Sequence, residues 1–259
     1  MNSRPETPER EMLFFEHVRE LRRRLIISVI ALAVGFVIAF AVYDYYIQIL
    51  IEPFDERLYA TRIEQAFLMK IKISAYVGII FSFPIHIYNI VAFILPALTR
   101  KERKYMIGLL SGSFVLLVIG GYLGYFQILP LSLKFLKSDA LIPANVDTWL
   151  SFQDSLLFVF QLMLAFVALF QLPIVLLFLM AMNIVRRAQL FRSGRYVIVA
   201  IFITAALLTP PDVVSQLGLG LPLIVLYYVT ILIAKIFRFG EPDEYATGDE
   251  EEAVGMENG

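Results

Sequence analysis

The 259-residue chain contains no cysteine and only two histidines, His17 and His86. Without cysteine it can form no disulfide, no thiolate nucleophile and no Cys-ligated metal site. Two histidines on different segments cannot build a paired-histidine haem site or an H-E-x-x-H zinc motif. The sequence also lacks a G-x-S-x-G nucleophile motif and a phosphate-binding G-x-x-x-x-G-K loop. We therefore expect no enzymatic activity, no metal and no cofactor.

Charge is missing from long parts of the chain, in which 17% of the residues are charged and 59% are hydrophobic. A soluble helix keeps one polar face, whereas six runs lack Asp, Glu, Lys and Arg entirely. A hydrocarbon core of roughly 30 Å takes about 20 apolar helical residues to cross, and the runs do not alternate as membrane β-strands do. The sequence predicts an all-α, polytopic membrane protein with six transmembrane helices. The uncharged runs are 25–43, 73–99, 105–133, 155–185, 196–211 and 213–234.

The first run has a second interpretation, because Ala39-Phe40-Ala41 has the small-x-small pattern of a signal-peptide cleavage site. Its 19 uncharged residues exceed the core of a typical signal peptide, about 7–15 residues, and a long charged region precedes it. We expect 25–46 to be a retained helix.

The distribution of Lys and Arg predicts the orientation in the membrane. Sixteen of the 22 basic residues lie before the first run, after the second, after the fourth and after the sixth, which places both termini in the cytoplasm. We expect a cytoplasmic amphipathic helix in 1–24 that lies along the membrane interface and then turns into the first span. The six-helix domain is 25–238, and 239–259 is an acidic tail, disordered and solvated. This tail could alternatively repel the anionic lipid surface or meet a basic partner.

Prolines and short runs predict a bent scaffold. Pro84 and Pro173 lie inside long uncharged runs and should kink those helices, so that the helices curve around a hollow and form a concave scaffold. The fifth helix, 196–209, would have 14 residues and span about 21 Å. The sixth should be interrupted at Pro222. We expect short fifth and sixth helices that thin the bilayer locally; a re-entrant hairpin is the alternative.

Two small-residue stripes mark the third run, at Gly108-x-x-x-Gly112 and Gly120-x-x-x-Gly124. Such stripes allow helices to approach closely. We expect close packing inside the monomer, with a dimer face as the alternative.

Four segments carry a family resemblance. Residues 17–25 read HVRELRRRL; 93–98 read FILPAL, followed by Glu102 and Arg103; and 208–216 read LTPPDVVSQ. Ile49, Glu52 and Pro53, with Phe67 and Lys72, fall in the first outer loop and the start of the next helix. In this order the segments resemble the motifs of the TatC family, the multi-span receptor subunit of the twin-arginine protein translocase. The resemblance extends over about 9–238.

The resemblance implies a subunit that binds the twin-arginine signal peptides of folded precursors and nucleates the translocation site. Its implied partners are these precursors, single-span subunits of the TatA/TatB type and membrane lipid, in a hetero-oligomer with several copies; no nucleic-acid partner is expected. The implied location is the bacterial inner membrane, with an organellar membrane left open. The implied signal-peptide-binding residues are Glu20, Arg22, Phe93, Glu102 and Arg103, and the implied partner- or cavity-facing residues are Pro53, Phe67, Lys72, Gln171, Asp212 and Gln216.

The chemistry of the two glutamates fits this role. A carboxylate can accept both arms of a guanidinium fork, which a lysine ammonium cannot mimic. Arg22 and Arg103 next to them either orient the carboxylates or are structural salt-bridge partners.

Gln171 lies where members of the family that the chain resembles often have a glutamate, and its neutral amide argues against a mechanism that requires a charged or titrating carboxylate at that depth. Its amide faces a cavity or partner, or bonds to the Leu169 carbonyl that Pro173 frees. Asp212 and Gln216 are expected to fix the hairpin between helices five and six, although Gln216 could meet a partner helix.

The main alternative function is a secondary transporter or channel for a small solute. Such proteins show repeated broken helices and several ionisable groups inside the membrane. The chain has no convincing repeat, and apart from tyrosines His86 is the only ionisable side chain well inside a run. A membrane enzyme is the third possibility, but it lacks a nucleophile–base pair or a metal set.

Overall fold

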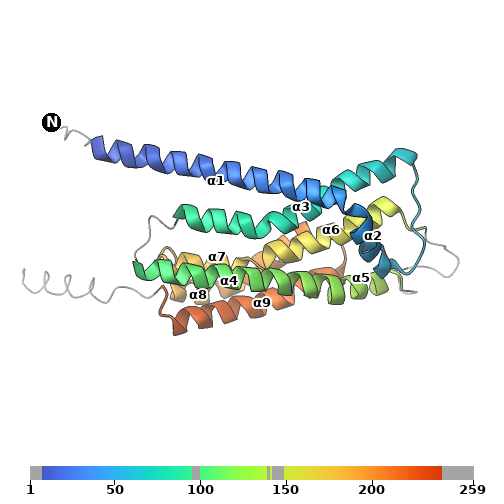
Figure 1. Ribbon diagram of the computed structural model, residues 1–259. Coiled ribbons are helices and arrows are strands. Elements are labelled where there is room, and N and C mark those ends of the chain that lie inside the picture. Colours follow the sequence, from blue (N-terminus) through green and yellow to red (C-terminus); the bar gives the residue numbers. More distant parts are fainter. Residues whose placement is uncertain (1–7, 95–99, 139–140, 142–148, 241–259) are drawn as a thin grey trace, which may run out of the picture.

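The computed structural model describes residues 8–94, 100–138, 141 and 149–240, with the backbone alone at 8–17, 94 and 100–107. Every regular element in this part of the chain is a helix (Figure 1). In order, they are α1 (Pro8–Ala41), α2 (Tyr43–Ile51), the 3₁₀ turn η1 (Glu52–Phe54), α3 (Ile63–Ile94), α4 (Arg100–Tyr122), the π-helical η3 (Leu123–Ile128), α5 (Leu129–Leu136), α6 (Phe152–Leu169), α7 (Leu172–Ala181), α8 (Arg187–Leu208) and α9 (Val213–Ile236).

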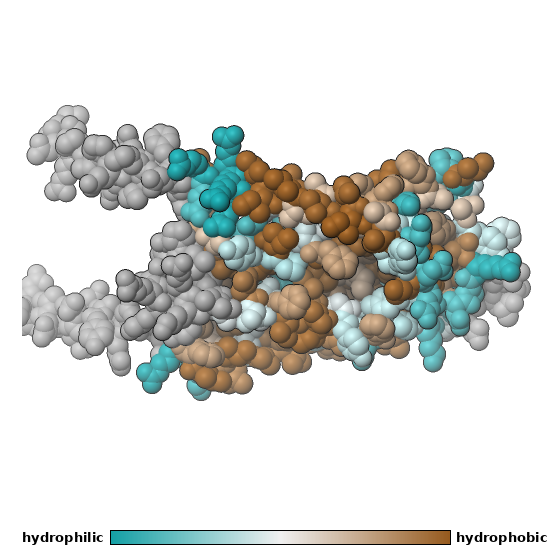
Figure 2. Space-filling model, viewed as in Figure 1, coloured by the Kyte–Doolittle hydropathy of each residue, from teal (hydrophilic) through white to brown (hydrophobic). Residues whose placement is uncertain are grey.

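Six helical segments of the described chain are long and apolar enough to cross a membrane, which confirms the predicted number. They are Val18–Ala41, Ile63–Phe93, Gly108–Leu136, Phe152–Ala181, Arg187–Leu208 and Val213–Ile236. The beginning of α1 and the end of α9 lie at the same end of the bundle (Figure 1). Hydrophobic side chains cover the middle of the visible face and hydrophilic ones gather toward its two ends (Figure 2), as expected for a protein that spans a bilayer.

The N-terminal helix and the first span form one element. α1 runs for 34 residues from Pro8 to Ala41, about 51 Å at 1.5 Å per residue. The helical character expected before residue 25 is confirmed, but the turn expected at the start of the first span is absent. Arg, Leu and Glu, which fill residues 19–25, are strong helix formers, and no proline interrupts them.

Two prolines bend their spans as predicted. Pro84 lies inside α3, where it removes one backbone hydrogen bond. Pro173 lies in the first turn of α7, and Phe170 and Gln171 form the break that separates α7 from α6. Apolar grooves of about 450 and 480 Å³ lie on the bundle, in agreement with the concave scaffold.

The lengths expected for the last two helices were wrong. α8 has 22 residues instead of 14, because the helix continues through the basic stretch 187–195, whose long side chains can extend toward water. α9 has 24 residues and passes through Pro222 without interruption. Both spans are nevertheless shorter than the second, third and fourth, which have 29 to 31 residues.

The core of the bundle is built on α6 and α7. Phe166 and Phe170 are fully buried there, and they pack against the glycine stripe of the third span. A Cβ on Gly120 would come within 2.9 Å of the Phe170 ring, and one on Gly124 within 2.7 Å of the end of Met163. The close packing inside the monomer is therefore confirmed for these two glycines.

α1 packs at the edge of the bundle, along α3. Gly35 and Gly78 meet there: a Cβ on Gly35 would lie 3.0 Å from the Gly78 carbonyl oxygen, and one on Gly78 would lie 2.8 Å from the Phe36 nitrogen. The backbones touch because neither residue has a side chain. This contact fixes how closely the N-terminal helix approaches the rest of the molecule.

Candidate functional site

Glu20, the first of the predicted receptor carboxylates, is half-buried on α1. Its Oε1 accepts a hydrogen bond from Arg24 Nη2 at 3.2 Å, one turn further along the helix. The sequence pointed to Arg22 as the neighbour that orients Glu20, but Arg22 is exposed. The spacing of four residues between Glu20 and Arg24 was the signal that could have identified the pair.

α3 supplies the other wall of this site. The Arg24 guanidinium carbon lies 6.0 Å from the centre of the Tyr88 ring, and Asn89 Nδ2 donates to Ser28 Oγ at 2.9 Å. Since Gly35 further along α1 meets Gly78 earlier on α3, the two helices are antiparallel, and Phe93, one turn beyond Asn89, lies toward the end of α1 that carries Glu20. Phe93 is half-buried. The structure thus brings Glu20 and Phe93 to one end of the α1–α3 pair.

Glu102 and Arg103 lie in the first turn of α4, which starts at Arg100. This turn is at the same end of the bundle as the beginning of α1 and the end of α3 (Figure 1). Their side chains fall outside the described residues, so the backbone alone places them at the end of the bundle that carries Glu20.

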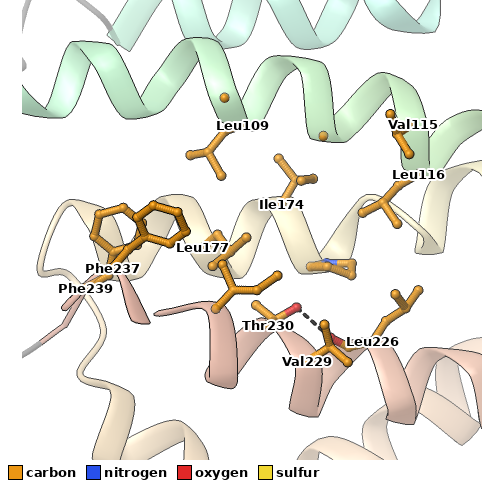
Figure 3. A pocket seen from close by; sticks show the side chains of 14 residues that line it. Leu109, Val115, Leu116, Ile174, Leu177, Leu226, Val229, Thr230, Phe237 and Phe239 are labelled. Carbon is orange, nitrogen blue, oxygen red and sulfur yellow. Dashed lines mark hydrogen bonds between the residues drawn. The ribbon is translucent and has the colours of Figure 1, made fainter. Parts of the chain in front are cut away.

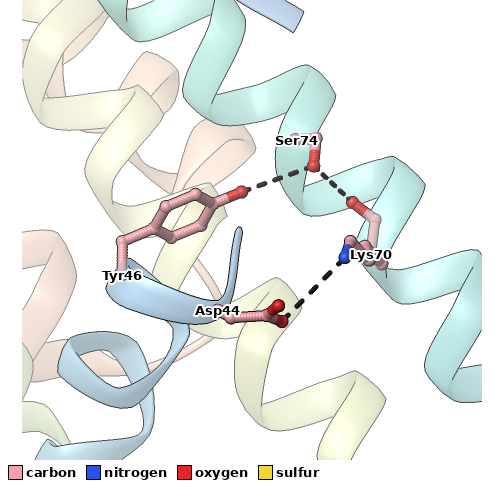
Figure 4. Close-up of polar contacts among 4 residues, drawn as sticks. All are labelled: Asp44, Tyr46, Lys70 and Ser74. Atoms are coloured by element: carbon pink, nitrogen blue, oxygen red, sulfur yellow. Dashed lines mark hydrogen bonds and ion pairs between the residues drawn. The ribbon is translucent and has the colours of Figure 1, made fainter. Parts of the chain in front are cut away.

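At the opposite end, Pro53 forms part of η1 and is half-buried, while Phe67 and Lys72 on α3 are exposed. Lys70, not Lys72, makes the contacts in this region (Figure 4). Its Nζ is 3.9 Å from Asp44 Oδ1, and it lies 5.0 Å from the centre of the Phe40 ring and 4.9 Å from that of Tyr43. No sequence pattern indicated this cluster, because Asp44 and Lys70 are far apart along the chain.

Hydrogen bonds complete the same cluster. Tyr46 Oη and Ser74 Oγ are 3.3 Å apart, and Ser74 Oγ donates to the Lys70 carbonyl at 2.7 Å (Figure 4). Burial, and then the neighbouring Tyr46 and Asp44, raise the pKa of Tyr43 to about 12. Tyr43 is therefore neutral at physiological pH, and its ring faces the lysine cation. Together these contacts fasten α2 to α3.

Gln171 is 4% exposed and bonds across to the third span. Ser113 Oγ donates to its Oε1, and its Nε2 donates to the Ser113 carbonyl at 3.2 Å. Of the alternatives that the sequence left open, the bond to the Leu169 carbonyl is not the one found, because the amide bonds to a neighbouring helix of the same chain. A two-way contact of this kind ties α4 to the break between α6 and α7.

Asp212 and Gln216 fix the hairpin of α8 and α9, as the sequence indicated. Asp212 is the N-cap of α9: its Oδ1 accepts from the Ser215 N–H at 2.7 Å, and Ser215 Oγ donates to its Oδ2. Gln216 Nε2 donates to the Phe202 carbonyl of α8 at 3.2 Å. Both side chains are thus used inside the monomer.

The 450 Å³ groove lies between α4, α7 and α9 (Figure 3), and its lining is almost entirely apolar. Thr230 is the exception, and its hydroxyl donates to the Leu226 carbonyl of its own helix at 2.6 Å. Among the described residues no three His, Asp or Glu side chains are grouped so that they could hold a metal ion. The polar groups that do come together in the described residues join helices of the bundle or cap them.

Six spans with polar clusters at both ends define a multi-pass helical membrane protein. The chain belongs to the TatC family, because the model of "Sec-independent protein translocase protein (TatC)" matches residues 16–222. The resemblance noted in the sequence is confirmed. Membership in this family makes the chain a component of a protein translocase: it is a transport subunit and not an enzyme. The alternative function, a solute transporter, is thereby rejected.

Individual relatives agree. The TatC protein of Carboxydothermus hydrogenoformans is 34% identical over 92% of this chain and 98% of its own length. The TatC protein of Aquifex aeolicus is 38% identical over 85% of this chain and 94% of its own length. The TatC protein of Escherichia coli is 34% identical over 85% of this chain and 87% of its own length. A crystal structure of the twin arginine translocase receptor TatC superimposes with a TM-score of 0.74 at 36% identity, covering 87% of this chain and all of that one.

Proposed function

We propose that this chain is the receptor subunit of a twin-arginine translocase, which binds the signal peptides of folded precursors and nucleates the translocation site. The observation that carries the proposal is the half-buried Glu20 carboxylate, bonded to a guanidinium at the end of the bundle where α3 ends and α4 begins. We assign this end to the cytoplasm, with both termini there. The membrane is the bacterial inner membrane.

The chemistry of this end supports the assignment. A carboxylate and a guanidinium form charge-assisted hydrogen bonds that are stronger than neutral ones, and Glu20 already has such a partner in Arg24. Phe93, at the same end of the α1–α3 pair, adds apolar surface for the hydrophobic part of a signal peptide. Arg22, exposed on α1, and Glu102 with Arg103 at the start of α4 complete the proposed binding set.

The partners are single-span subunits of the TatA/TatB type, assembled with several copies of this chain in a hetero-oligomer. Phe67 is 61% exposed at the far end of α3, and Lys72 on the same helix is exposed as well. These two residues suit contact with a partner helix. Of the other residues proposed to face a partner or a cavity, Pro53 lies in η1, whereas Gln171, Asp212 and Gln216 bond inside the chain, at the central break and at the α8–α9 hairpin.

A photocrosslinking experiment tests the receptor role. A photoreactive amino acid replaces Arg23, an exposed residue one turn from Glu20, so that both proposed glutamates stay in place in the full chain in membranes, and a folded precursor with either a twin-arginine or a twin-lysine signal peptide is added. We expect crosslinks to the twin-arginine precursor at this position. Position Val37, exposed near the end of α1 that lies far from Glu20, is the control and should give none. Equal crosslinking of the two precursors at position 23 would reject the assignment.

The orientation in the membrane can be tested separately. The chain has no cysteine, so a single introduced cysteine is the only thiol that a reagent can label. A single Ser138→Cys substitution at the end of α5 should react with a membrane-impermeant thiol reagent added from outside the cytoplasmic membrane. Labelling of this cysteine from the cytoplasmic side alone would contradict the proposed orientation.

A further inference from the structure

The carboxylate of Glu20 already has a ligand from its own chain. Arg24 Nη2 lies 3.2 Å from Glu20 Oε1, and the two side chains are 25% and 30% exposed respectively. Arg24 therefore offers Glu20 the same planar group of donors that a signal-peptide arginine would offer. An incoming guanidinium that uses both carboxylate oxygens has to displace it.

Arg24 is held loosely for a partly buried arginine. Its Nε atom is buried and has no hydrogen-bond partner among the described residues, although a guanidinium normally uses most of its five N–H donors. Its second contact is the exposed Tyr88 ring, 6.0 Å from the guanidinium carbon, at the limit of about 6 Å for a cation–π interaction. The Tyr88 ring remains within reach when the ion pair opens, so the Arg24 guanidinium can contact this ring after it leaves Glu20.

We infer that Arg24 is an internal competitor for the receptor carboxylate and sets the affinity for the signal peptide. The inference rests on the proposed function, since Glu20 must be the group that receives the arginine. The free receptor exchanges between a closed state, with Arg24 on Glu20, and an open state, with Arg24 against Tyr88. The peptide binds the open state, so its apparent affinity is lowered by the fraction of receptor that is open.

The expected size of this effect follows from the kind of ion pair involved. Pairs four residues apart on a helix surface are weak, and closing one lowers the affinity for an outside ligand by about two- to threefold. A competitor of this strength lowers the affinity for twin-arginine and twin-lysine peptides by the same factor. The ratio between them, which the Glu20 carboxylate sets by its geometry, stays unchanged.

A purely structural role for Arg24 predicts the opposite change in peptide affinity when Arg24 is replaced. If Arg24 orients Glu20 for the peptide, its removal loosens the carboxylate and weakens binding. If Arg24 competes, its removal tightens binding. The direction of the change therefore separates the two roles, whatever its size.

The experiment uses the full chain in lipid nanodiscs and a fluorescent peptide with a twin-arginine or a twin-lysine signal sequence. Binding is titrated by fluorescence anisotropy. We expect Arg24→Gln to tighten binding of both peptides by about two- to threefold, and Arg24→Lys, which keeps the charge and loses the fork, to tighten it by less. Arg23→Gln removes the same charge from the exposed neighbouring position and is the matched control; the gain from Arg24→Gln should exceed its effect.

Weaker or unchanged binding in both Arg24 variants would overturn the inference. The Glu20→Gln variant tests the underlying function separately, because it should abolish the preference for arginine. If Glu20→Gln leaves twin-arginine binding intact, the proposed site itself is wrong. If Glu20→Gln weakens binding and the Arg24 variants also weaken it, the site stands and only the competition is refuted. In the Glu20→Gln background, Arg24→Gln should give no further tightening.

Discussion

The first span and the fourth are almost equally apolar, yet they occupy opposite environments. In the most apolar window of each, 6% of the residues are buried in Val18–Ala41 and 56% in Phe152–Ala181. Hydrophobicity cannot explain this difference, because lipid tails are as apolar as leucine and do not drive helices together. The difference comes from partners: the fourth span contacts the glycine stripe of the third, whereas α1 meets α3 through Gly35 and Gly78.

The central spans and the N-terminal helix therefore have different structural roles. The central spans hold the fold, and α1 with the end of α3 forms a peripheral unit that carries Glu20. The proposed receptor carboxylate thus lies on a peripheral helix, where it can adjust to a ligand without disturbing the core. The following substitutions test that division, in order of decreasing expected effect.

The largest effect is expected for Phe166→Ala in α6. The Phe166 side chain is fully buried against the third span, and the loss of such a ring costs about 3–5 kcal/mol of unfolding free energy. Thermal or denaturant unfolding in detergent measures it. Val37→Ala on α1, where the side chain is 62% exposed, is the control and should change stability little. Equal losses at the two positions would remove the distinction between core and periphery.

Gly78→Ala should separate α1 from α3. The added Cβ would lie 2.8 Å from the Phe36 nitrogen, and overpacking of this kind costs about 1–3 kcal/mol. The yield of a disulfide between Ser28→Cys and Asn89→Cys, whose native side chains are hydrogen-bonded, reports the approach of the two helices and should fall. Gly121→Ala is the control, since a Cβ there meets nothing within 4 Å. An unchanged yield in the Gly78 variant would mean that α1 does not depend on this contact.

Asp212→Ala removes the N-cap of α9 and should cost about 1 kcal/mol. Asp212→Asn keeps an oxygen that can accept from the Ser215 N–H, so it should lose less. Thermal unfolding compares the two variants. Equal losses would assign the effect to the charge of Asp212 instead of to its capping bond.

The smallest effect is expected for the Gln171–Ser113 pair between the third and fourth spans. Hydrogen bonds between membrane helices contribute about 0.6 kcal/mol on average. A double-mutant cycle with Gln171→Leu and Ser113→Ala should give a coupling energy of about this size. Additive losses would show that the two residues act independently, despite the bonds between them.

The proposed receptor end could be predicted in part from the sequence. Glu20 and Phe93 were identified from motifs, and the structure brings them together because α1 and α3 are antiparallel. Arg24 was missed in that role, although its spacing from Glu20 is local information. Lys70 was missed for a different reason: its partners Asp44, Phe40 and Tyr43 are close only after α2 folds back on α3.

The ends of the helices could likewise be predicted from the sequence only in part. The break at Phe170 and Gln171 follows from Pro173, and the cap at Asp212 follows from the prolines before it, so both were predictable. The length of α8 was not, because a run of charges ends the apolar stretch without ending the helix. Likewise α9 tolerates Pro222, since a membrane helix can adjust locally around a missing N–H.

The sequence by itself determined that this protein spans a membrane six times, because long uncharged runs have no other stable environment than lipid. It also determined the family, through short motifs whose order along the chain is preserved. Tertiary structure alone decided which helices are core and which face lipid, since that depends on where glycines meet large side chains. It also decided that Glu20 is bonded to Arg24, that Lys70 lies against the aromatic rings of Phe40 and Tyr43, and that Gln171 is bonded to Ser113, because such pairings depend on distances that only folding sets.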